Sequence, residues 1–79
     1  MYTFEQFVGY DYHILRKAGM TIRYYRISVG WLEEVTRYSD CGKNETLTVF
    51  KNNQDAYDAY RESMQSYGFK RFDISKGNY

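Results

Sequence analysis

The side chains that could carry covalent or acid–base chemistry are few in this sequence. His13 is its only histidine and Cys41 its only cysteine. A cysteine nucleophile needs a histidine within hydrogen-bond reach and a third group that orients the pair. We expect His13 in a helix and Cys41 in a distant turn, so nothing in the sequence brings them together. A zinc site would need three or four closely spaced ligands, and the chain has no such cluster.

Two further patterns are too weak to build an active site. Glu33 and Glu34 are adjacent carboxylates, but adjacent residues of a strand point to opposite faces. The six glycines are single and scattered, so no glycine-rich loop is present to hold a phosphate. We therefore predict a protein that is not an enzyme and that has no metal site and no cofactor.

The most suggestive local feature is Arg23-Tyr24-Tyr25-Arg26. On a strand, Tyr24 and Arg26 share one face, while Arg23 and Tyr25 share the other. Exposed Tyr and Arg side chains are favoured in protein interfaces, and they also stack on bases and contact phosphates. Cross-strand pairing with solvated arginine heads explains the same pattern equally well.

The first element that we expect is a helix over residues 4–18. Thr3 and Gln6 have the spacing of a capping box, and apolar residues then recur at roughly helical intervals. Gly19 is placed to end this helix.

Strands are expected next. Thr21–Val29 is rich in β-branched and aromatic residues, and we expect its odd positions to face the core and Tyr24 and Arg26 to face outward. Trp31–Tyr38 fits a helix or a strand. A strand is favoured because Gly30 resembles a hairpin turn and three strands bury a face better than two.

The second half of the chain is easier to interpret. Glu45–Lys51 alternates as a strand does, and Asn52 or Asn53 can cap a helix that ends at Gly68. Phe69–Ile74 is expected to form a short closing strand, with the last three residues frayed.

These elements predict an α+β fold in a single domain over residues 1–79. The expected architecture is a small antiparallel sheet of three to four strands with two helices, in the order helix, three strands, helix and short strand.

Composition constrains the environment and the core. The chain is 43% hydrophobic and 27% charged, and it contains ten Tyr, which suit both a thin core and a binding surface. Formal net charge is only +1, so no overall field favours nucleic acid. A single cysteine, no apolar run of membrane-spanning length and no export pattern predict a cytoplasmic protein without membrane contact.

Three segments are similar to parts of known families. Thr21–Tyr25 is similar to the recognition-helix signature of MerR-type regulators. Val35–Tyr38 followed by Phe50 resembles the WGR domain of DNA-break sensors. The helix–strands–helix order looks like a double-stranded-RNA-binding domain. The diagnostic residues of each family are missing, so no family is assigned.

The sequence therefore predicts a small binding protein that acts on a protein partner through a Tyr- and Arg-rich sheet surface. Its size and lack of catalytic groups are typical of phage or mobile-element inhibitors of host defence enzymes. The alternative is a nucleic-acid-binding module that uses the basic segment 16–26. Homodimer formation through a strand edge is compatible with either function. The candidate partner-binding residues are Tyr24, Arg26, Arg23, Arg16 and Lys17.

Overall fold

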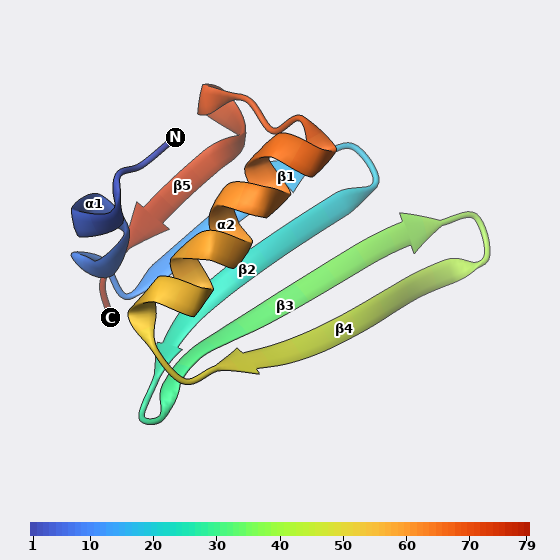
Figure 1. Ribbon diagram of the computed structural model, residues 1–79. Coiled ribbons are helices and arrows are strands. Elements are labelled where there is room, and N and C mark those ends of the chain that lie inside the picture. Colours follow the sequence, from blue (N-terminus) through green and yellow to red (C-terminus); the bar gives the residue numbers. More distant parts are fainter.

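A five-stranded antiparallel sheet carries both helices of the chain in the computed structural model, which describes residues 1–79 (Figure 1). The strand order across the sheet is β4-β3-β2-β1-β5. The α+β class is confirmed, but the sheet has five strands rather than three or four. The elements are α1 (Phe4–Val8), β1 (Tyr12–Lys17), β2 (Met20–Ile27), β3 (Gly30–Ser39), β4 (Gly42–Phe50), α2 (Asn53–Tyr67), a 3₁₀ turn (Arg71–Asp73) and β5 (Ile74–Gly77).

The additional strand is β1, and the prediction of one helix over residues 4–18 is wrong beyond Val8. The capping box is present, since Thr3 Oγ1 accepts from the Gln6 amide at 3.2 Å. However, β1 pairs with β2 on one side and with β5 on the other. His13 and Leu15, two residues apart, are both fully buried, so this segment follows strand alternation.

The remaining strands form a meander. The segment over residues 31–38 is a strand, as preferred. The hairpin of β3 and β4 extends beyond the start of β2, because Met20, the first residue of β2, pairs with Arg37 and β3 continues to Ser39. In Figure 1 this hairpin projects away from α2.

The helix α2 begins and ends as predicted. The Asn52 side chain accepts from the Asp55 amide at 2.8 Å, and Gly68 follows the last turn with a φ of 66°. Neither helix has both the length and the apolar character that crossing a membrane requires.

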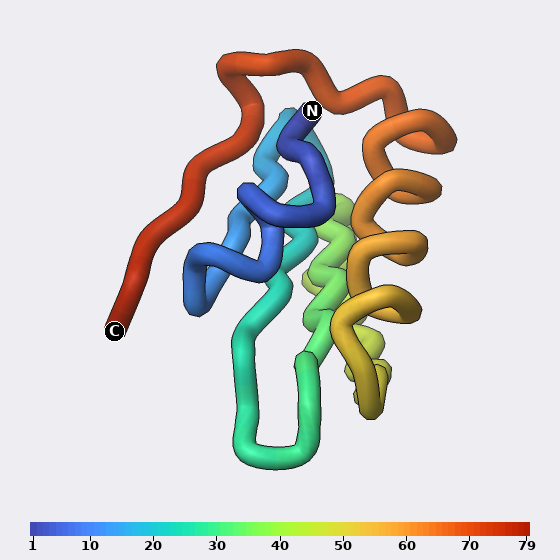
Figure 2. The backbone as a smooth tube through the Cα atoms, turned by 60° about the vertical axis from the view of Figure 1, so that its left-hand side comes forward, coloured from blue at the N-terminus to red at the C-terminus, as the bar shows by residue number.

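The end of the chain differs from the prediction. Residues 71–73 form a 3₁₀ turn, and the closing strand is β5, four residues long, instead of Phe69–Ile74. Figure 2 shows the connection from α2 running over one end of the sheet to β5. The last residues, expected to fray, are hydrogen-bonded: the Tyr79 amide donates to Asp11 at 3.0 Å, and its hydroxyl donates to the Arg26 carbonyl at 3.1 Å.

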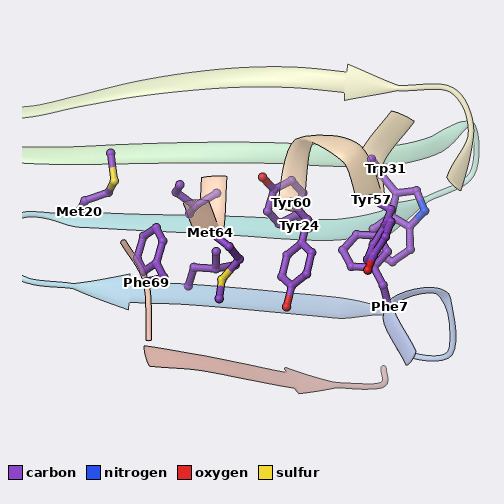
Figure 3. Close-up of a cluster of buried hydrophobic side chains, with 11 residues drawn as sticks. Phe7, Met20, Tyr24, Trp31, Tyr57, Tyr60, Met64 and Phe69 are labelled. Atoms are coloured by element: carbon purple, nitrogen blue, oxygen red, sulfur yellow. The ribbon is translucent and has the colours of Figure 1, made fainter. Parts of the chain in front are cut away.

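The core lies between the helices and one face of the sheet. Figure 3 shows its side chains along the strands, with Met20 and Phe69 towards one end and Phe7 and Trp31 towards the other. The indole N–H of Trp31 donates to Asn53 at 2.9 Å and so fixes the start of α2. The buried hydrophobic cluster consists of Phe7, Leu15, Met20, Ile22, Tyr24, Trp31, Ala56, Tyr57, Tyr60, Met64 and Phe69.

The backbone of Gly30, where β3 begins, lies very close to the backbone where β4 ends. Gly30 has a φ of +138°, and a Cβ there would overlap the backbone of Phe50 and Lys51. We expect Gly30→Ala to lower the free energy of unfolding by about 2–5 kcal/mol, through backbone strain and overlap together. Gly42→Ala is the matched control, because Gly42 has a φ of +127° with nothing near its Cβ position. Its cost should be about 1–2 kcal/mol, and equal costs in urea unfolding would contradict the close packing at Gly30.

Candidate binding surface

The orientation of β2 decides which residues are available to a partner, and the predicted orientation is wrong. Directly paired residues of neighbouring strands lie on the same face of a sheet. Tyr24 pairs with His13 and Glu33, and both Tyr24 and His13 are fully buried under the helices. The even positions of β2 therefore face the core, and the odd positions, including Arg23 and Tyr25, face the other way. A shift of one residue in the expected alternation exchanges the two faces of a strand, so the prediction placed the residues of β2 on the wrong faces.

Tyr24 is held in a polar chain and is not on the surface. Its hydroxyl donates to Glu33 at 2.7 Å and lies 3.0 Å from Ser63 Oγ, which donates to it in turn because the phenol has one proton. Burial, followed by the negative charge of Glu33, raises the pKa of Tyr24, so the phenol stays neutral. Glu33 and Ser63 line a groove of about 320 Å³ between α2 and the β3–β4 hairpin, which Glu62 also lines. Activating Ser63 as a nucleophile would need an adjacent base, and this phenol is not one.

Arg26 and Lys17 are also used within the chain on the helix side. The Arg26 guanidinium lies 4.5 Å from the centre of the Trp31 ring, contacts Asp11 at 3.2 Å and donates to the carbonyls of Val8 and Tyr10. Lys17 donates to the carbonyl of Tyr67. These cations hold α1 and the end of α2 against the sheet.

Only Arg16 and Arg23 of the five predicted residues lie on the helix-free face, which we call the open face. The Arg23 guanidinium is 3.1 Å from Glu34, and both side chains are partly exposed. Arg16 is exposed and pairs directly with Thr21. The structure thus divides the basic segment 16–26 between two faces of the sheet.

The central part of the open face consists of three rows of directly paired residues across β1, β2, β3 and β4, and Tyr38 and Lys43 pair beyond them. Leu47 is 61% exposed and Val49 52% exposed, and the two aliphatic side chains lie on the same face of β4. From β1 to β4 we name the rows apolar (Tyr12, Tyr25, Leu32 and Val49), mixed (Ile14, Arg23, Glu34 and Leu47) and charged (Arg16, Thr21, Thr36 and Glu45).

The sequence interpretation missed the apolar members of these rows. Leu47 and Val49 share a face in the alternating segment Glu45–Lys51, and that spacing was a usable signal. Alternating apolar residues usually indicate the buried face of a strand. Here Leu47 and Val49 are exposed, because both helices pack on the opposite face of the sheet.

His13 and Cys41 are not brought together. His13 is fully buried on β1, stacked on Phe7 with ring centres 4.4 Å apart, and its Nε2–H donates to the Phe7 carbonyl at 2.7 Å. Its Nδ1 atom is buried without a hydrogen-bond partner. Cys41 is an exposed free cysteine in the turn of the β3–β4 hairpin. No group of three His, Cys, Asp or Glu side chains is arranged to hold a metal ion.

Comparison of the chain with protein-family models, curated proteins and solved structures gives no significant match. The similarity of Thr21–Tyr25 to a recognition helix has no structural counterpart, because these residues lie in the strand β2. The functional interpretation therefore depends on the geometry of the chain itself.

The adjacent residues Tyr24 and Tyr25 provide a matched test of the two faces. Tyr24→Phe removes the hydroxyl that joins Ser63 to Glu33, and we expect a loss of about 1–2 kcal/mol in the free energy of unfolding. Tyr25→Phe should change it by less than about 0.5 kcal/mol, because Tyr25 lies on the partly exposed open face. Equal losses in denaturant unfolding would contradict the orientation of β2.

The burial of His13 predicts a dependence of stability on pH. Desolvation, with smaller effects of Lys76 and Arg26, outweighs the Phe7 hydrogen bond and lowers the pKa of His13 below its ordinary value of 6.5. The unfolded chain then binds a proton at a higher pH than the folded chain does. The stabilisation is complete above pH 6.5 and is lost as the pH falls through the folded-state pKa, by up to about 1.4 kcal/mol per pH unit. The acid-side slope should be shallower in His13→Gln than in the wild-type chain, and unchanged slopes would contradict this role.

Proposed function

We propose that this chain is a non-enzymatic binding protein that docks onto a protein partner through the open face of its sheet. The observation that carries the proposal is the placement of both helices on one side, which leaves Leu47 and Val49 largely exposed on the other. Monomeric soluble proteins rarely expose contiguous apolar patches larger than a few hundred Å², and patches above that size are typical of interaction sites.

The layout of the open face supports a protein as the partner. The apolar row supplies two tyrosines and two aliphatic side chains, the mixed row adds Ile14 and Leu47, and the charged row lies beyond them. Protein interfaces likewise combine apolar area and aromatic residues with polar and charged residues at the rim. The rim includes the ion pair between Lys43 and Glu45, at 3.2 Å.

An inhibitory role is one use that such a surface can have. Covering the working surface of an enzyme requires shape and apolar contact but no catalytic group. We therefore propose that the partner is an enzyme blocked by this chain, as phage and mobile-element products block host defence enzymes.

The nucleic-acid alternative receives less support from the structure. Lys17 and Arg26 are bound within the chain on the helix side, and Arg23 is neutralised by Glu34. The open face therefore presents no continuous basic strip for a phosphate backbone. Binding to nucleic acid would be distinguished by an affinity that falls steeply with added salt.

The proposal is tested by capture of proteins from a nuclease-treated lysate of the source cells. Leu47→Asp places a charge in the open face and should abolish capture, because that charge would have to be desolvated in the interface. Gln65→Asp adds the same charge at an exposed position of α2 and should leave capture unchanged. Mass spectrometry of the retained proteins is the measurement, and retention of the same proteins by Leu47→Asp would disprove the proposed surface.

A further inference from the structure

The charges of the open face change sign across the sheet in two neighbouring rows. In the charged row, Arg16 lies on β1 and Glu45 on β4, with two threonines between them. In the mixed row, Arg23 lies on β2 and Glu34 on β3, with Ile14 and Leu47 outside them. Each row therefore has its arginine on the β1–β2 side and its glutamate on the β3–β4 side, while Arg23 and Glu34 also pair within the chain and Glu45 also pairs with Lys43.

A pattern of this kind is complementary to itself. Consider a two-fold axis parallel to the strands, placed between β2 and β3 just outside the open face. Rotation about this axis lays β1 of one copy over β4 of the other and β2 over β3, and it leaves every row at its own height. Arg16 then faces Glu45 of the other copy, and Arg23 faces Glu34.

The apolar residues match under the same rotation. Ile14 faces Leu47 in the mixed row. In the apolar row Tyr12 faces Val49, and Tyr25 faces Leu32. One symmetry operation thus places opposite charges together in two rows and apolar side chains together in the third, as a closed two-fold interface requires.

We propose that the open face is occupied by a second copy of this chain, in a face-to-face dimer with this axis. The inference goes beyond the proposed function, because it assigns a second copy of the chain to the same surface. A partner of different sequence would compete with the second copy for these residues.

The centre of the open face permits close approach of two sheets. Thr21 and Thr36 are short side chains that are only 5% and 3% exposed, so the middle of the charged row protrudes less from the sheet than Arg16 and Glu45 at its two ends. The rotation places each of these threonines against the other, and short side chains at the axis allow the usual sheet separation of about 10 Å. On β5 the open face carries Ser75 and Gly77, and Tyr79 packs against Tyr12 at this edge with ring centres 6.1 Å apart, so the second copy would meet both rings here.

The area of the open face is close to the lower limit for a specific dimer. Four strands of about eight residues cover about 19 Å by 26 Å. Two such faces bury on the order of 1,000 Å², which is the lower limit for a specific interface. We therefore expect a dimer that dissociates measurably on dilution.

Cross-linking tests the axis. In a Cys41→Ser background, the double variant Ile14→Cys/Leu47→Cys should form a covalent dimer with a short bis-maleimide, because the two thiols of different copies face each other. Either single variant should stay monomeric, because three strand spacings, about 14 Å, separate the identical positions of the two copies sideways. Efficient cross-linking of Leu47→Cys alone would indicate pairing of β4 edges and would overturn the face-to-face dimer.

Charge reversal tests the complementarity. Arg16→Glu should raise the dimer dissociation constant about tenfold in sedimentation equilibrium, because two attractive contacts become repulsive. Adding Glu45→Arg should restore the affinity to within about threefold of the wild-type value, since the charges again alternate between copies. A purified wild-type chain that is monomeric at its highest soluble concentration, or a double variant weaker than Arg16→Glu, would overturn the inference.

The two proposals fail separately. A monomeric wild-type chain whose capture of another protein depends on Leu47 would overturn the dimer and leave the proposed function in place. A dimer that cross-links as described, combined with capture that Leu47→Asp does not change, would support the dimer and disprove the proposed function.

Discussion

The packing of Phe7 into a group of aromatic rings is the interaction on which the rest of the structure depends. The helix α1 has only five residues, and Phe7 is the one that it buries completely. Its ring centre lies 4.4 Å from His13, 4.6 Å from Trp31 and 5.1 Å from Tyr60. These three residues come from β1, β3 and α2, so a single side chain joins both helices to the same face of the sheet. Aromatic side chains bury large areas, which lets a chain this short hold such an arrangement.

The open face is the consequence of that one-sided packing. Because α1 and α2 both pack on the face of the sheet that buries Phe7, neither helix covers Leu47 and Val49 on the other face. Polar groups are divided in the same way. Arg26 and Tyr24 form hydrogen bonds that hold the helix side together. Arg16 and Arg23 lie on the β1–β2 half of the open face, and Glu34 and Glu45 lie on its β3–β4 half.

The parts of the fold that sequence reasoning predicted well are those with local signals. The ends of α2 follow from Asn52 and Gly68, because capping and a left-handed glycine depend only on neighbouring residues. The strand β1 was missed because its residues fit a helical stripe as well as they fit alternation. What makes it a strand is pairing with β5, whose residues are about 60 positions away in the sequence and give no local signal.

The sequence by itself determined the α+β class, the limits of α2, the existence of β2 and β4, and the alternation that puts Tyr24 and Tyr25 on opposite faces, and it left residues 31–38 open as a helix or a strand. Only the tertiary structure decided which of those faces is the interior. Alternation fixes the relation between neighbouring side chains but not its phase, because both faces of β2 carry aromatic, aliphatic and arginine residues. The face of the sheet on which the helices pack decides which side of β2 is buried, and that packing is held by the burial of Phe7, Trp31 and Tyr60.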